Sequence, residues 1–245
     1  IHGKNPLPIH SGPAVTLTMQ LQQKMPSRRI IFHSLQGTQH EENQDNTLMI
    51  EADQLRLFIV FDGVSSARHA KLATELSKTF VANNYAQYQK SDRFRLSDLM
   101  HDVNSHLLHE QTRDLKTTYC AAYFLTNSPE TVWISHLGDS RAYVVSSQFM
   151  EQLTRDHSHA SMKNVITKCL GMADLSSKDF VTTKHPIYAD QKLLLCTDGF
   201  WSVLDTHWRE FFDAFQMKRP HNIKEKLYRL IKGHNTDDST YILIT

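Results

Sequence analysis

Residues 55–61 read LRLFIVF and are followed directly by Asp62 and Gly63. The run is almost continuously apolar, which predicts a strand buried on both of its faces. A carboxylate directly after such a strand is expected at the edge of a sheet. The sequence therefore predicts a strand that is buried on both faces and carries Asp62 at its end.

The same pattern recurs along the chain. Asp139 follows the run TVWISHL (131–137), Asp198 follows KLLLCT (192–197), Asp237 and Asp238 precede STYILIT (239–245), and Asp45 precedes a short strand at 47–51. Carboxylates at strand ends can converge at one edge of a sheet, where cations must offset their mutual repulsion. Oxygen ligands without Cys or His beside them favour Mg²⁺ or Mn²⁺ over Zn²⁺. The pattern predicts a metal-dependent enzyme that acts on phosphate.

Composition narrows the class of protein. The chain has 245 residues, 40% of them hydrophobic and 22% charged, with a net charge of +1. This balance gives no electrostatic reason to expect nucleic acid or an anionic membrane as a partner. No apolar run approaches the roughly 18 residues of a membrane span. Cys120, Cys169 and Cys196 show no disulfide or zinc spacing, which favours a reducing compartment and predicts a cytoplasmic location.

The order of expected elements indicates an architecture. We expect a flexible N-terminal tail over residues 1–27 and one domain over 28–245. Strands are expected at 29–33, 47–51, 55–61, 119–125, 131–137, 142–145, 149–153, 192–197 and 239–245. Helices are expected from Ser65 or Ser66 to Tyr88 and at 97–113, 162–169, 208–215 and 222–232. Stacked antiparallel sheets flanked by helices fit this order better than a parallel βαβ sheet, so the fold class is α+β.

Six motifs occur in the order found in one known family. They are HEENQD (40–45), DGVSS (62–66), GDSRAY (138–143), LTRDHS (153–158), TDGFW (197–201) and DDST (237–240). Together they resemble the metal-dependent serine/threonine phosphatases of type 2C, in particular the small bacterial members. The resemblance implies an α-β-β-α sandwich of two antiparallel sheets flanked by helix pairs.

The resemblance also implies a metal site and a reaction. The implied metal residues are Asp45, Asp62, Gly63 (through its carbonyl), Asp139, Asp198 and Asp237. Asp62 would bridge two ions, Asp45 would hold metal-bound water, and Asp139 would serve a weaker third ion. In the implied reaction, two Mg²⁺ or Mn²⁺ ions about 3.5–4 Å apart would bind a bridging hydroxide, which would attack phosphoserine or phosphothreonine in line. The implied catalytic residues are Asp45, Asp62 and His40.

The chain departs from the family pattern at several points. His40 stands where the family has a phosphate-holding Arg, and His lacks the bidentate fork of Arg, so we expect weaker substrate binding. Val64-Ser65-Ser66 replaces a small, glycine-containing stretch after Asp62-Gly63. Only residues 159–169 separate the Asp-His-Ser motif from Leu170, where the family has a longer flap. A short flap predicts a more open site, with substrate choice set elsewhere or by a partner protein.

Three functions follow from these features. The first is a protein phosphatase with a phosphoprotein substrate and a cognate serine/threonine kinase in the same pathway. The alternative is a catalytically weak or inactive phosphatase fold that binds a phosphoprotein or a regulatory partner, as His40 and the short flap suggest. A two-metal nuclease or phosphodiesterase fits the carboxylates alone, but the near-neutral charge and the lack of a basic stripe disfavour it.

Overall fold

The computed structural model describes residues 28–90, 92–159 and 162–245, and within these ranges two five-stranded antiparallel sheets pack face to face. The first sheet has the strand order β1 (Ile30–Leu35), β12 (Ser239–Ile244), β11 (Lys192–Cys196), β6 (Arg141–Val145) and β7 (Met150–Gln152). The second has the order β10 (Thr182–Pro186), β5 (Thr131–Leu137), β4 (Thr117–Leu125), β3 (Leu55–Gly63) and β2 (Asn46–Glu51). The strands β8 (Ser158–His159) and β9 (Met162–Ile166) pair antiparallel in a small hairpin.

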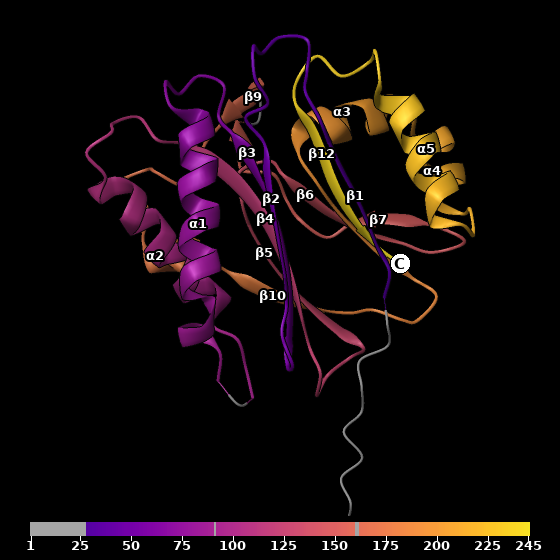
Figure 1. Cartoon of the computed structure of the whole chain (residues 1–245), viewed down its shortest axis with the longest axis horizontal. Helices are drawn as coiled ribbons and strands as arrows, with labels where there is room; N and C mark the ends of the chain where they lie inside the picture. The colour runs from indigo at the N-terminus through magenta and orange to yellow at the C-terminus, as the bar shows by residue number, and fades with distance from the viewer. Residues whose placement is uncertain (1–27, 91, 160–161) are drawn as a thin grey trace, which may run out of the picture.

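Helices cover the outer face of each sheet (Figure 1). On the second sheet lie α1 (Ala70–Tyr88) and α2 (Leu96–His109). On the first sheet lie α3 (Asp198–Thr206), α4 (Trp208–Phe215) and α5 (Pro220–Ile231), and a short 3₁₀ turn, η1, spans Ser177–Asp179. The α-β-β-α sandwich is confirmed, with three helices instead of two on one side. None of the helices that the structure describes is both long and apolar enough to cross a bilayer.

The strand β3 is buried on both faces, as its sequence predicts. Leu57, Ile59 and Phe61 belong to the apolar layer under α1 and α2. Phe58 and Val60 point the other way, into the layer between the two sheets. Side chains alternate across a strand, so an uninterrupted apolar run fills two layers at once. This strand therefore contributes both to the layer under the helices and to the layer between the sheets.

Antiparallel pairing brings the acidic residues to one end of the sandwich. In the second sheet Asn46 is opposite Phe61, Asp62 is opposite Thr118, and Tyr119 is opposite Leu137. The carboxyl ends of β3 and β5 and the amino end of β2 therefore lie together. In the first sheet Cys196 is opposite both Tyr241 and Arg141, which places the end of β11 beside the start of β12.

Two local predictions were wrong, and one helix was not expected. The expected helix at 162–169 is the strand β9 followed by a bend and irregular chain, because Val165, Ile166 and Thr167 are β-branched residues that favour an extended chain. The first helix begins at Ala70 after His69 instead of at Ser65 or Ser66. The helix α3 was not expected, because it opens with Asp198-Gly199 and both residues are poor helix formers. The expected tail at 1–27 lies outside the described residues.

Candidate metal centre

Asp62 and Asp198 meet at the centre of this end of the molecule. Asp62 lies near the carboxyl end of β3, and Asp198 is the first residue of α3. The backbone N–H of Asp198 points to Oδ2 of Asp62 at 3.5 Å. The amino end of a helix carries a partial positive charge, which stabilises a nearby carboxylate. The two sheets thus bring together carboxylates that are 136 residues apart in the chain.

Asp45 joins the same group from the loop before β2. The hydroxyl of Thr197 donates a hydrogen bond of 2.9 Å to Oδ2 of Asp45. Thr197 directly precedes Asp198, so this bond ties the loop of Asp45 to the amino end of α3. Thr197 has no role among the sequence-based predictions, although its position between a strand and Asp198 was the available signal.

Burial and mutual repulsion raise the pKa values of these carboxyl groups. The pKa of Asp62 is well above its ordinary value because of burial first, then because of the charges of Asp198, Asp45, Asp139 and Asp237. Burial also raises the pKa of Asp45. Burial followed by the charges of Asp139 and Asp237 raises the pKa of Asp198 to about 7. The pKa of Asp139 rises to about 6, mainly through burial. The cluster therefore repels itself when all its members are ionised.

Several oxygens of the cluster are buried and have no hydrogen-bond partner among the described residues. They are Oδ1 of Asp45, Oδ1 of Asp139 and Oδ1 of Asp198. A buried carboxylate oxygen without a donor is costly unless a cation approaches it. The donor set is entirely oxygen, which suits Mg²⁺ or Mn²⁺. The residues present therefore fit divalent metal ions of this kind.

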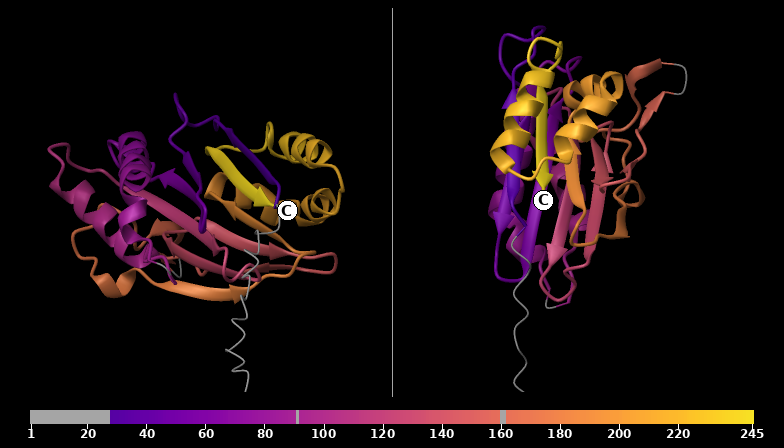
Figure 2. Two further views of the ribbon diagram at one scale, coloured as in Figure 1. Left: turned by 60° about the horizontal axis from the view of Figure 1, so that its bottom comes forward. Right: turned by 90° about the vertical axis from the view of Figure 1, so that its right-hand side faces the viewer.

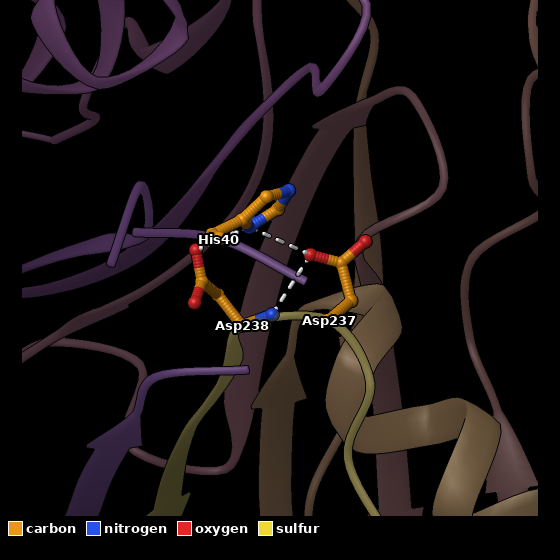
Figure 3. A group of neighbouring side chains, drawn as sticks. All are labelled: His40, Asp237 and Asp238. Atoms are coloured by element: carbon orange, nitrogen blue, oxygen red, sulfur yellow. Dashed lines mark hydrogen bonds and ion pairs between the residues drawn. The ribbon is translucent and has the colours of Figure 1, made fainter. Parts of the chain in front are cut away.

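His40, Asp237 and Asp238 form a second, adjacent group (Figure 3). Nδ1 of His40 lies 3.0 Å from Oδ2 of Asp238 and 3.4 Å from Oδ1 of Asp237. A carboxylate accepts hydrogen bonds, so Nδ1 carries a hydrogen. The other ring nitrogen points away from both carboxylates (Figure 3). His40 is thus held by the loop that carries Asp237.

Asp238 orders the polypeptide around this site. Its side chain is 2% exposed, and it accepts hydrogen bonds from the backbone N–H of Gly37 at 2.8 Å and of Gln44 at 2.7 Å. Ligand atoms of His40, Asp237 and Asp238 lie within 4.8 Å of one another, a spacing that could hold an ion. Both oxygens of Asp238 already accept hydrogen bonds, so we assign this carboxylate to holding residues 37–45 in place. This role of Asp238 was not predicted from the sequence, because it depends on long-range contacts.

Two glycines let the loops approach the turn of Asp237 and Asp238. A Cβ on Gly37 would lie 2.3 Å from the carbonyl carbon of Asp237, and a Cβ on Gly199 would lie 2.2 Å from the carbonyl oxygen of Asp238. No Cβ atom is tolerated so close to a backbone atom, so both positions require glycine.

We therefore expect Gly199→Ala to lower the free energy of unfolding by about 1–3 kcal/mol, the usual cost of overpacking. Alanine in an unhindered helix would instead stabilise by up to about 1 kcal/mol relative to glycine, so the sign identifies the contact. Urea denaturation would measure it, with Ser202→Ala on the exposed face of α3 as the matched control. A stabilised Gly199→Ala protein would contradict the close packing of α3 on Asp238.

Gly63 and Asp139 complete the predicted set. Gly63 ends β3 directly after Asp62, and a Cβ there would come within 3.0 Å of the Cβ atoms of Ala70 and Gln44. Asp139 follows β5 and is 5% exposed, and its carbonyl accepts a 2.8 Å hydrogen bond from Nε1 of Trp201. The structure thus places all the sequence-predicted site residues at one end of the sandwich. Their roles as metal ligands remain predictions.

Comparisons with known proteins agree with this geometry. The family model described as "Protein phosphatase 2C" matches residues 36–232. A Listeria monocytogenes protein described as "Serine/threonine phosphatase stp" is 24% identical over 246 aligned residues, which cover 87% of this chain and 94% of that protein.

Solved structures show the same fold. A crystal structure of Stp1, a serine/threonine phosphatase from Staphylococcus aureus, has a TM-score of 0.74 at 19% identity and covers 90% of this chain and 95% of that one. A bacterial serine phosphatase also has a TM-score of 0.74, at 22% identity, covering 89% of this chain and 97% of that one. Because the family model spans most of the sequence, including the residues from His40 to Asp198, the chain belongs to the protein phosphatase 2C family.

Proposed function

We propose that this protein removes phosphate from phosphoserine and phosphothreonine in proteins, using divalent metal ions. The main support is the group of buried carboxylates at one end of the sandwich, three of whose oxygens lack hydrogen-bond partners among the described residues. Membership in the phosphatase 2C family and the names of the relatives support the same reaction.

The proposed metal residues are those implied by the sequence. They are Asp45, Asp62, Gly63, Asp139, Asp198 and Asp237. Mg²⁺ or Mn²⁺, when bound, would neutralise the phosphoryl oxygens and supply an activated water as the nucleophile. The N–H of Asp198 and the hydroxyl of Thr197 hold Asp62 and Asp45 in position for these ions. The buried thiols support a reaction without a cysteine nucleophile, because burial raises the pKa of Cys169 to about 11 and that of Cys196 well above its ordinary value.

His40 is the proposed contact for the substrate phosphate. Its Nδ1 is engaged by Asp238, and its other ring nitrogen points away from the carboxylates, where it can meet a ligand. A single ring nitrogen makes one hydrogen bond in place of a bidentate pair, so the proposal retains the expectation of weak phosphate binding. A hollow of about 460 Å³, lined by residues 39–42 and Gln44, lies beside the ring.

The proposed domain, substrates and compartment of the protein agree with the same reaction. Residues 28–245 would form one phosphatase domain whose substrates are phosphoproteins, and a serine/threonine kinase would act on the same proteins. The three free, buried cysteines support a reducing compartment, and we propose the cytoplasm.

The test is hydrolysis of p-nitrophenyl phosphate and of a phosphothreonine peptide with Mn²⁺, Mg²⁺ or EDTA. We expect turnover with either metal and none with EDTA. No turnover with any metal, from protein shown to be folded by circular dichroism, would contradict the proposal. In that case binding of the unhydrolysed phosphopeptide would favour the alternative of an inactive phosphatase fold.

A further inference from the structure

The turn that carries Asp139 is hydrogen-bonded to His157, a residue outside the proposed set of metal ligands. The backbone N–H of His157 donates to the carbonyl of Gly138 at 2.9 Å. The N–H of Gly138 in turn donates to Nδ1 of the His157 ring at 3.2 Å. One histidine therefore binds both polar groups of the residue that precedes Asp139.

A chain of contacts closes around the same turn. Nε1 of Trp201 donates to the carbonyl of Asp139 at 2.8 Å, and the guanidinium of Arg141 lies 3.5 Å from the centroid of the Trp201 ring. Arg141 donates to Asp156 through Nη2 at 2.8 Å and through Nε at 3.0 Å. Asp156 is the neighbour of His157, so the ring of contacts returns to the turn. This closure fixes where the His157 backbone lies relative to Asp139.

The His157 ring must be neutral at Nδ1 to accept the N–H of Gly138. It stacks on the ring of His136 with centroids 4.8 Å apart and an interplanar angle of 16°. Burial, followed by the charges of His136 and Lys168, lowers the pKa of His157 to about 4, against the opposing charges of Asp156 and Asp179. The acceptor is therefore present at every pH near neutrality.

His157 also lies at the base of the β8–β9 hairpin, directly before β8. Its carbonyl accepts a 2.7 Å hydrogen bond from the N–H of Thr167, and β8 begins at the next residue, Ser158. The hairpin projects from the body of the molecule in the right-hand view of Figure 2. Any displacement of its stem would act on Gly138 through His157.

We propose that His157 is a positioning residue that fixes Asp139 by accepting the N–H of Gly138, and that it thereby joins the β8–β9 hairpin to the metal site. The inference rests on the proposed role of Asp139 in holding a metal ion. His157 itself would touch neither metal nor substrate.

Two substitutions of His157 distinguish its role as a hydrogen-bond acceptor from the packing of its ring. His157→Asn keeps an acceptor, because the side-chain oxygen of Asn can take the place of Nδ1. His157→Phe keeps a ring that can stack on His136 but removes the acceptor. His185→Phe on the edge strand β10 is the control for replacing a half-buried histidine that has no contact with Gly138.

The first measurement is hydrogen exchange at the Gly138 amide in metal-free protein. We expect His157→Phe to speed this exchange about tenfold or more, and His157→Asn and His185→Phe to leave it within about threefold of the parent protein. Calorimetric titration with Mn²⁺ should show the weaker binding step lost or several-fold weaker in His157→Phe only. With the phosphothreonine peptide, kcat should fall in His157→Phe while KM stays within about twofold.

Unchanged Gly138 exchange in His157→Phe would overturn the inference. Equal losses in His157→Asn and His157→Phe would also overturn it, because they would assign His157 a packing role alone. The exchange and calorimetric measurements need no turnover, so failure of the proposed phosphatase activity would be distinguishable from failure of this inference.

Discussion

Asp62→Asn is expected to lower kcat/KM for a phosphothreonine peptide by about a thousandfold or more, while making the metal-free protein more stable. Asp62 lies at the centre of the cluster, where the charges of Asp198, Asp45, Asp139 and Asp237 all act on it. An amide removes the carboxylate that is proposed to hold both metal ions. A loss of about 4 kcal/mol of transition-state stabilisation corresponds to this factor.

The gain in stability has the same physical origin. Without metal, the folded protein must hold several carboxylates close together in a buried place, and removal of one charge relieves the others. We expect the melting temperature in EDTA to rise for Asp62→Asn. Ordinary damage to the fold would lower it.

The control is Asp53→Asn, which lies on an exposed turn just before the opposite end of β3. This substitution should leave both turnover and melting temperature unchanged. Substantial activity in Asp62→Asn would show that the metal site lies elsewhere. A lowered melting temperature together with lost activity would leave the loss attributable to unfolding.

The sequence could locate the carboxylates because strand ends are visible in the pattern of apolar residues. Asp62, Asp139 and Asp198 each follow an apolar run, and antiparallel pairing places those run ends together. The uninterrupted apolar run of β3 likewise predicted that both faces of this strand are buried. These features depend on neighbours in the chain, which a sequence displays directly.

The supporting residues could not be found in this way. Asp238 acts through Gly37 and Gln44, which are 201 and 194 residues distant in the chain. His157 acts on Gly138 across 19 residues, through a hydrogen bond that requires a particular ring orientation. Such contacts arise only when the two sheets are packed.

The helix α3 was missed for a related reason. Local propensity argues against a helix that opens with Asp198-Gly199. Gly199 nevertheless packs against the Asp238 carbonyl, and this contact is possible only because glycine has no Cβ. The residue that looks like a turn signal is therefore needed for tertiary contact. Tertiary packing has overridden local propensity at this point.

In the metal-free protein, stability is expected to fall as the pH rises from about 5 to about 7. The pKa of Asp198 is about 7 in the folded protein and that of Asp139 is about 6, both above the ordinary value of 3.8. Between the unfolded and folded pKa values the folded protein binds more protons than the unfolded chain. Its extra stability is thus complete below the unfolded value and is lost as the pH rises through the folded one. The change should be about 1–3 kcal/mol across this range.

Histidines oppose this trend. Burial lowers the pKa values of His136 and His157, so these groups make the folded protein less stable as the pH falls below their unfolded value. The useful quantity is therefore the difference between the parent protein and Asp198→Asn, since both contain the same histidines. Urea denaturation in EDTA at several pH values should show this difference growing towards pH 7.

Saturating Mn²⁺ should remove most of that slope, because bound cations hold the carboxylates ionised at all these pH values. The same denaturation series with Mn²⁺ in place of EDTA provides the comparison. A slope in the parent protein that is identical with and without metal would mean that the titrating groups are not metal ligands. A slope that Mn²⁺ removes in the parent protein, and that Asp198→Asn already reduces in EDTA, would tie the acidic cluster, its burial and its cations to one site.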